Sequence, residues 1–272
     1  MWSLRVFNLF KHLAARHGIF VVINAILLAG FEFLICAVVS TIDIPSVLGE
    51  IMKNIPPLMR SLIEQQIFGG GFNSKGMLAF GWNHPIALAI GAAVAIVLAT
   101  RALAGEIENG AIEFLLSQPI SRYGYFTANV IFAILALAAL SLIGASGTLI
   151  GQQTYGLRAF DYLIMLKLVL NYFLLNLVWY GVTLAISVFG REAGRVAFTG
   201  FLLALISYLI QVIGQFWSAA EFLLPYTVNT YYSSKQILLE NCLQAKSIGV
   251  LISVTLVSLC AGAWRLMKRD IP

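Results

Sequence analysis

Long apolar blocks separated by short polar segments run along most of the chain. The first block covers residues 18–40 and contains one charged side chain, Glu32. Five more blocks follow at about 84–104, 124–151, 162–189, 196–218 and 247–264. Because a helix of about 20 apolar residues crosses the hydrocarbon core of a bilayer, the pattern predicts an all-α integral membrane protein with six transmembrane helices.

The composition excludes an ordinary soluble domain. Hydrophobic residues make up 60% of the 272 residues and charged residues 11%, whereas soluble domains have roughly 45–50% and about 25%. The excess of 17 basic over 12 acidic residues is typical of membrane proteins, whose cytoplasmic segments are enriched in Lys and Arg. We therefore expect the chain to contact a lipid bilayer and no nucleic acid.

The distribution of basic residues predicts where the termini lie. An even number of spans places both termini on one side of the membrane. The segments on that side hold ten of the 17 Lys and Arg residues in roughly 54 positions, and the segments on the other side hold seven in roughly 87. Because Lys and Arg near span ends favour the cytoplasmic side, we expect both termini to be cytoplasmic.

Residues 1–17 have the pattern of an amphipathic helix that lies on the membrane surface. The apolar positions recur at helical spacing, and the polar positions fall on the opposite side. The apolar set is Trp2, Val6, Leu9, Phe10 and Leu13, and the polar set is Arg5, Asn8, His12 and Arg16. Two interpretations stay open: a basic anchor that only fixes topology, or an interfacial elbow helix that helps to seat a cytoplasmic partner.

A short acidic segment, residues 105–122, lies between the second and third predicted spans. Read as a helix, it carries a polar stripe and a separate apolar stripe, which suggests two unlike neighbours. The polar stripe is Glu106, Asn109, Gly110, Glu113 and Ser117, and the apolar stripe is Ile107, Ala111, Phe114 and Leu115. Pro119 cannot continue this helix, and Ser121 is placed to cap the next one.

The glutamates of this segment stand where the bias for cytoplasmic Lys and Arg would predict basic residues. They therefore indicate a protein partner, or internal pairing with Arg101 and Arg122.

The run Glu-Ile-Glu-Asn-Gly-Ala-Ile-Glu-Phe-Leu-Leu-Ser-Gln-Pro-Ile-Ser-Arg in this segment resembles the motif of ABC-2 type transporter permeases after their second span. The six-span layout and the basic amphipathic N-terminus resemble that family across residues 1–272, as a single transmembrane domain. Ala111 stands where family members often have Thr. The resemblance implies a short cytoplasmic coupling helix, in which the matching residues are Glu106, Glu108, Gly110, Glu113, Ser117, Pro119 and Arg122. The alternative is a capped loop helix that stabilises its own span ends.

The resemblance also implies a homodimeric permease in the plasma membrane of a prokaryote, paired with two copies of a separate ATPase that binds ATP and magnesium. The chain contains no GxxxxGK[ST] phosphate-binding loop, so we expect ATP hydrolysis on that partner and no cofactor on this chain. Few charges lie within the spans, which favours export of a hydrophobic or amphipathic substrate. Two alternatives remain: a membrane scaffold or maturation subunit that delivers a metal or sulfur species, and an intramembrane enzyme, for which no HExxH motif is present.

Polar side chains inside the predicted spans are candidates for a translocation path. Glu32 is expected to face protein or a cavity, because a carboxylate in hydrocarbon costs several kcal/mol; it either lines the path or makes an interhelical hydrogen bond. Ser207, Gln211 and Gln215 lie at i, i+4 and i+8 and share one helical face. That face either lines a path shared by a dimer or makes interhelical hydrogen bonds.

The cysteines and histidines form no framework that predicts a metal site. None of the three cysteines belongs to a CxxC pair, and the three histidines are scattered. Cys36 and Cys242 could form a disulfide in an oxidising compartment, and unpaired thiols are the alternative.

Overall fold

The computed structural model describes residues 2–41, 53, 55–56, 74–110, 121–157 and 161–268, and within these it leaves aside the side chains of 2–8, 74–75 and 215–216. The described residues form helices and their connections, with no β-strand among them. Six helices are long and apolar enough to cross a membrane, which confirms the predicted fold class. Their spanning segments are Leu9–Thr41, Gly76–Ala102, Arg122–Thr154, Tyr162–Ser187, Ala193–Gly214 and Ala245–Lys268.

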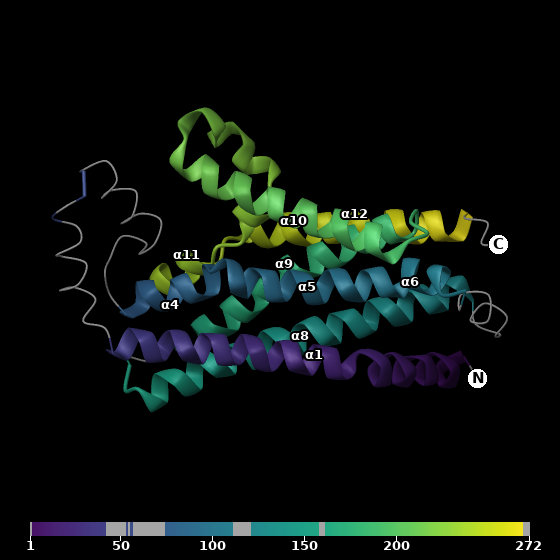
Figure 1. Ribbon diagram of the computed structural model, residues 1–272, viewed down its shortest axis with the longest axis horizontal. Coiled ribbons are helices and arrows are strands. Elements are labelled where there is room, and N and C mark those ends of the chain that lie inside the picture. The colour runs from purple at the N-terminus through teal and green to yellow at the C-terminus, as the bar shows by residue number, and fades with distance from the viewer. Residues whose placement is uncertain are drawn as a thin grey trace.

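The helices cross the bundle in alternating directions, so the N- and C-termini emerge together (Figure 1). We call that end the terminal end and the opposite end the distal end. The long elements are α1 (Trp2–Thr41), α5 (Pro85–Ala102), α8 (Arg122–Thr154), α9 (Tyr162–Ser187), α10 (Ala193–Phe216) and α12 (Ala245–Lys268). The short ones are α4 (Ser74–Asn83), α6 (Ala104–Glu108), η1 (Ser218–Tyr226), η2 (Val228–Tyr231) and α11 (Ser234–Glu240).

The N-terminal segment does not form the separate interfacial helix that its pattern predicts. Helix α1 runs without a break from Trp2 to Thr41, a length of 40 residues. Gly18 is the only weak helix former where the predicted boundary lies, and a single glycine costs only about 1 kcal/mol in a helix. Because no proline or capping residue stops the helix there, the amphipathic N-terminal sequence continues directly into the first span.

The second span begins earlier than the apolar pattern suggests. Helix α4 occupies the end of the segment that the sequence reads as an outer loop, and α5 follows it after one residue, His84. The His84 Nδ1 atom accepts a hydrogen bond from the Ile86 N–H at 3.2 Å, and Pro85 takes the first position of α5. This cap and the missing proline N–H explain why the chain restarts a helix here.

Helices α1 and α8 pack along each other over most of their length. Three glycines of α8, at i, i+3 and i+7, make this possible: Gly144, Gly147 and Gly151. A Cβ at Gly147 would overlap the backbone of Ala29 on α1. Small residues allow two helices to approach closely in a bilayer, where packing rather than the hydrophobic effect holds helices together.

Helix α9 lies at the centre of the bundle and contacts α5, α8, α10, α11 and α12. Helix α10 is peripheral: only 17% of the residues in its most apolar window are buried, against 61% for α9. Towards the distal end α10 leans away from the other helices, and η1 folds back beside it (Figure 1). The fold therefore consists of a tightly packed centre with α10 on its outside.

Candidate functional site

The acidic segment between the second and third spans starts with a short helix, which ends after a few residues. Helix α6 ends at Glu108, and Asn109 and Gly110 form a turn in which Gly110 has a φ of 68°. A glycine in the left-handed region just after the last helical residue is a common way for a helix to end. The predicted stripe that joins Glu106 to Glu113 along one helix is therefore wrong. Glu113, Ser117 and Pro119 lie outside the described residues.

Glu106 forms an ion pair with Arg16 of α1. Its side chain is 4% exposed, whereas that of Arg16 is 35% exposed. The sequence predicts internal pairing with Arg101 or Arg122, but the residue that reaches Glu106 lies 90 positions earlier in the chain. Removing one partner of a half-buried pair of this kind costs about 1–3 kcal/mol, between the values for exposed and for fully buried pairs.

Helix α6 is also tied to α9 and to α10. The Ala104 N–H donates to the Ser187 hydroxyl of α9 at 2.9 Å, and this hydroxyl donates to the Thr100 carbonyl at 3.4 Å. On the other side, the Glu108 carboxylate accepts a hydrogen bond from the Ala193 N–H at 2.7 Å. Ala193 is the first residue of α10, so the carboxylate satisfies one of the free N–H groups there and complements the positive end of the helix dipole.

The start of α8 lies beside the same end of the bundle. The Ser121 hydroxyl accepts the Gly124 N–H at 3.0 Å, which confirms the predicted cap. Arg122 turns towards the C-terminal helix, where its guanidinium donates to the Leu266 carbonyl at 3.5 Å. The described part of the acidic segment is thus bonded to several spans at once.

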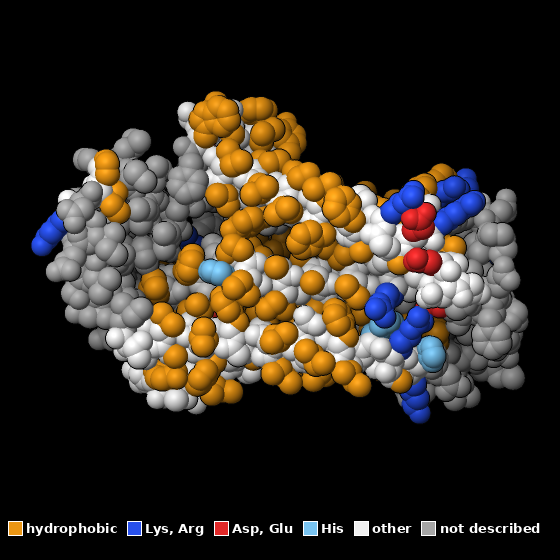
Figure 2. All heavy atoms as spheres, viewed as in Figure 1, with side chains coloured by type: hydrophobic (Ala, Val, Ile, Leu, Met, Phe, Trp, Pro, Cys, Tyr) orange, Lys and Arg blue, Asp and Glu red, His pale blue; other side chains and the backbone are white. Residues whose placement is uncertain are grey.

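Charged side chains gather at the terminal end, while apolar side chains cover the middle of the molecule on the face seen in Figure 2. The basic residues near this end are Lys11, Arg16, Arg101, Arg122, Arg191, Arg195, Arg265 and Lys268. Glu192 and Arg195 form an exposed ion pair at 2.7 Å beside the start of α10. The terminal end is therefore a basic surface with carboxylates set into it.

Glu32 lies in the packed centre of the distal half and is fully buried. One carboxylate oxygen accepts a hydrogen bond from the Thr148 hydroxyl of α8 at 3.3 Å, and the Trp82 indole donates to the same hydroxyl at 3.1 Å. The other oxygen has no hydrogen-bond partner among the described residues. The interhelical hydrogen bond that the sequence allows is present, and Glu32 does not line the pocket described below.

The three polar residues predicted to share one face of the fifth span do not share one environment. Ser207 turns inward, where its hydroxyl accepts the Asn229 N–H at 3.2 Å and lies 3.5 Å from the Asn229 side-chain oxygen. Gln211 is half-buried, and the side chain of Gln215 lies outside the described residues. Ser207 therefore makes the interhelical hydrogen bond rather than facing a free surface.

A second polar stripe, which the sequence analysis missed, runs along α9. Its members are Tyr172, Asn176, Tyr180, Thr183 and Ser187, all at most 1% exposed. The spacing of 4, 4, 3 and 4 residues is that of one helical face, so the periodicity was available as a signal. Tyr172 donates to the Ala87 carbonyl at 2.6 Å, whereas the Tyr180 and Thr183 hydroxyls have no partner among the described residues.

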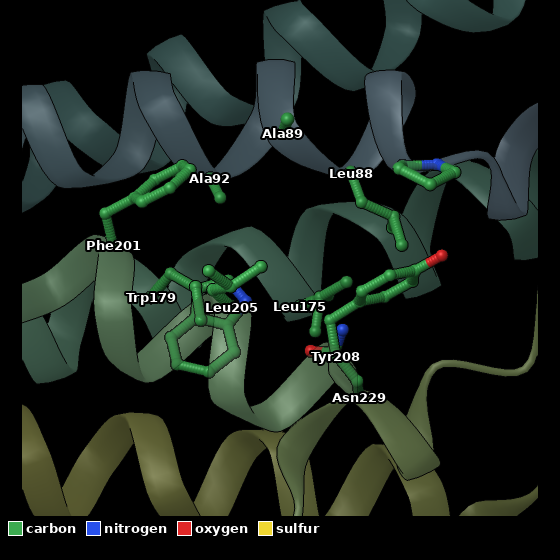
Figure 3. Close-up of a pocket in the computed structure, with 11 residues that line it drawn as sticks. Leu88, Ala89, Ala92, Leu175, Trp179, Phe201, Leu205, Tyr208 and Asn229 are labelled. Carbon is green, nitrogen blue, oxygen red and sulfur yellow. The ribbon is translucent and has the colours of Figure 1, made fainter. Parts of the chain in front are cut away.

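A pocket of about 250 Å³ lies between α5, α9, α10 and η2. Figure 3 shows Leu88 and Ala92 of α5 across from the α10 side chains, with Phe201 and Tyr208 at opposite ends of the pocket. None of the described residues that line it is charged. The sequence gives no signal for this pocket, because four separate segments contribute to it.

The described residues hold no group of three His, Cys, Asp or Glu side chains that could bind a metal ion. Cys36 is buried, Cys242 is exposed, and both are free thiols. The open question of a disulfide between them is therefore answered for this structure: they do not pair.

Comparison with known proteins gives one family. Residues 14–271 match the family model described as ABC-2 family transporter protein. No curated protein matches the chain. The match covers all six spans and the acidic segment.

Proposed function

Because the chain belongs to the ABC-2 family of transporter proteins and is a permease subunit of an ABC transporter, we propose that it exports a hydrophobic or amphipathic substrate. In this proposal two copies of the chain act with a separate ATPase, which supplies ATP hydrolysis. The terminal end faces the cytoplasm and receives the ATPase. The family match supports the transporter class, and the geometry at α6 supports the way in which the ATPase acts.

The observation that carries the proposal is the set of three ties from α6 to three different spans. Glu106 pairs with Arg16 of α1, Ala104 bonds to Ser187 of α9, and Glu108 bonds to the first residue of α10. A short helix that is fixed in this way cannot move alone. If a docked ATPase displaces the segment that begins with α6, the force reaches α1, α9 and α10 together, which is a rigid-body mode of switching.

The burial of Glu106 favours a role in transmitting movement to the spans rather than in docking the ATPase. Its side chain is 4% exposed and already paired, so it has little surface to offer a partner. We therefore propose that Glu106 and Arg16 couple α6 to α1, while docking uses residues that follow Gly110. Glu113, Ser117 and Pro119 remain proposed members of that docking surface, on the basis of the motif alone.

The orientation proposal rests on charge. Eight described Lys and Arg residues lie near the terminal end, and positively charged segments are retained in the cytoplasm during insertion. The same basic surface with recessed carboxylates suits a soluble protein partner better than open hydrocarbon. In a chain whose native cysteines are replaced by serine, because Cys242 is itself an exposed thiol, labelling of a cysteine placed at Arg191 by a membrane-impermeant maleimide in intact cells would contradict this orientation.

The test of coupling uses the permease co-expressed with an ABC ATPase from the same organism and reconstituted in lipid nanodiscs. Arg16→Gln and Glu106→Gln should each lower permease-dependent ATP hydrolysis about tenfold, because each leaves a charge without its partner. The swap Arg16→Glu with Glu106→Arg should restore part of this activity. Glu192→Gln, which removes an exposed carboxylate at the same end, is the matched control and should stay within about twofold.

Three outcomes would overturn parts of the proposal separately. Failure of any ATPase to co-purify would exclude the separate ATPase partner. Normal hydrolysis in both single variants would exclude the coupling role of the Arg16–Glu106 pair. Coupled hydrolysis without movement of any apolar or amphipathic compound across the membrane would favour the scaffold or maturation role.

A further inference from the structure

Glu32 is enclosed where three elements meet in the distal half of the protein. It belongs to α1, Thr148 of α8 bonds to it, and Gly81 of α4 lies directly against it. Helix α4 in turn packs against α11 towards the distal end (Figure 1). The Glu32 side chain is fully buried within one copy of the chain, so a second copy in a dimer cannot uncover it.

The carboxyl group has fewer hydrogen-bond donors than an ionised carboxylate requires. Its Oε2 accepts from the Thr148 hydroxyl at 3.3 Å, and this hydroxyl accepts from the Trp82 indole at 3.1 Å. Its Oε1 is buried and has no hydrogen-bond partner among the described residues. A carboxylate offers about four acceptor positions on its two oxygens, and a buried carboxylate stays ionised when several donors or a cation face it.

No described cation interacts with Glu32. The titratable side chains that do interact with it electrostatically are Cys36 of α1, Tyr172 of α9 and Tyr232, which follows η2. None of these three carries a positive charge in any protonation state. Among the described residues, α4, α5 and α8 contribute no titratable side chain to this set. His84, between α4 and α5, contacts the ring of Phe31 instead, and Lys235 of α11 has no electrostatic interaction with Glu32.

A proton is the ligand that fits this site. An unpaired charge inside a membrane protein is strongly unfavourable, whereas a protonated Glu32 leaves only one neutral hydroxyl without an acceptor. A metal ion would need about six oxygen ligands, and the Thr148 hydroxyl is the only described group that bonds to the carboxyl. The proton therefore belongs on Oε1, while Oε2 is the carbonyl oxygen that accepts from Thr148.

Helix α4 covers the carboxyl group too closely for water to lie between them. A Cβ at Gly81 would lie 3.0 Å from Oε2 of Glu32 and 3.2 Å from the side chain of Ile35. An ionised carboxylate at this position would need water or donors that the closed packing does not supply. The contact between α1 and α4 must therefore open before the proton can leave.

Helix α4 also carries hydrogen bonds to the segment at the start of α11. The Tyr232 hydroxyl donates to the Trp82 carbonyl at 3.0 Å, and the Ser234 hydroxyl donates to the Asn83 side-chain oxygen at 2.8 Å. On the other side, α4 is separated from α5 by the single residue His84. A movement of α4 away from α1 therefore also displaces the start of α11.

We propose that Glu32 is a proton-binding site whose occupancy controls the position of α4. With the proton bound, α1, α4 and α8 pack together and the distal end is closed over Glu32. When the proton leaves, the charge that remains on Glu32 is stabilised only if α4 moves away and admits water. The distal end of the permease therefore opens more readily at alkaline than at neutral pH.

The first experiment detects the proton itself and uses the purified permease alone, so its result does not depend on an ATPase partner. Infrared spectra are recorded at neutral pH in dodecyl maltoside, a detergent without a carbonyl group. The wild type should show the carbonyl stretch of a protonated carboxylic acid, and Glu32→Gln should lose it. Glu192→Gln, at an exposed carboxylate, is the matched control and should leave it unchanged.

Thr148→Val keeps the acid and removes its one donor, so it identifies the band even if Glu32→Gln does not fold. The carbonyl stretch should move to higher frequency in this variant, because a hydrogen bond to Oε2 is lost. A spectrum that is the same in wild type and Glu32→Gln and unshifted in Thr148→Val would overturn the proton-binding site.

The second experiment measures opening with Cys36, which lies one turn from Glu32 on α1 and is fully buried. The chain carries Cys242→Ser and Cys260→Ser, and labelling by N-ethylmaleimide is followed with and without Glu32→Gln. Both chains should be protected at neutral pH. At alkaline pH the chain with Glu32 should be labelled at least about tenfold faster, because an unpaired buried charge disfavours the closed packing. The charge on Glu32 would itself disfavour the Cys36 thiolate, so faster labelling reports opening. Equal rates in the two chains at alkaline pH would overturn the control of α4.

Discussion

Helices α9 and α10 have nearly the same length, 26 and 24 residues, yet they occupy opposite environments. In α9, 61% of the most apolar window is buried, against 17% in α10. The buried helix is the less apolar one, with a mean hydropathy of 1.7 in that window against 2.2. In a bilayer the lipid is as apolar as leucine, so polar side chains, rather than apolar ones, are driven to the inside.

The contrast also extends to the hydrogen bonds that the two helices make. The α9 stripe reaches from Tyr172, bonded to α5, to Ser187, bonded to the start of α6. Helix α10 is bonded at its first residue to Glu108 and at Ser207 to Asn229, and the apolar pocket lies beside its middle part. Because Glu108 of α6 is bonded to the first residue of α10, a displaced α6 would act directly on this span.

The largest expected difference between the two helices is in the stability lost when an aromatic side chain is removed. Tyr172→Ala should lower the free energy of unfolding by about 3–5 kcal/mol, because this side chain is fully buried and bonded to Ala87. Phe198→Ala on α10, where the ring is 68% exposed, should change it by less than about 0.5 kcal/mol. Unfolding of both variants in bicelles, followed by steric trapping, gives the comparison. Equal losses would mean that α10 is packed against a second surface.

A smaller effect is expected where the two helices touch. A Cβ at Gly200 of α10 would lie 2.6 Å from the Thr183 hydroxyl of α9, whereas nothing lies within 4 Å of the same position at Gly194. Gly200→Ala should therefore cost about 1–3 kcal/mol through overpacking, and Gly194→Ala should stay within about 0.5 kcal/mol. The same unfolding measurement tests both. A neutral Gly200→Ala would show that α10 can shift away from α9 at little cost.

The number of spans and the fold class follow from the sequence because the length of an apolar block is a local property. Which span becomes central is not local, and hydropathy points the wrong way for α9 and α10. The polar spacing of Tyr172, Asn176 and Tyr180 was the better signal for a buried face. It identifies α9 as a helix whose one side cannot face lipid.

For the candidate site too, local features could be predicted from the sequence and long-range contacts could not. The motif placed Glu106 and Glu108 correctly at the junction of the second and third spans, and Asn109 followed by Gly110 carried a helix stop that the stripe interpretation overlooked. The partner of Glu106 was not foreseeable. Arg16 comes close to it only because α1 continues without a break past residue 17, where the predicted interfacial helix would end. The pocket depends on four segments, so no local pattern marks it.

The smallest expected effect is the change in stability when one hydroxyl is removed from each helix. The change should have opposite signs in the two helices. Ser207→Ala on α10 should cost about 0.6 kcal/mol, the usual value for one hydrogen bond within a membrane protein, because it removes the tie to Asn229. Tyr180→Phe on α9 should be neutral or slightly stabilising, since this buried hydroxyl has no partner among the described residues and its desolvation is then a pure cost. Both variants keep the shape of the side chain nearly unchanged, so unfolding free energies measured side by side isolate the hydroxyl. A clear loss of stability in Tyr180→Phe would mean that the hydroxyl is hydrogen-bonded in the membrane, and the α9 stripe would then be a hydrated seam rather than a dry one.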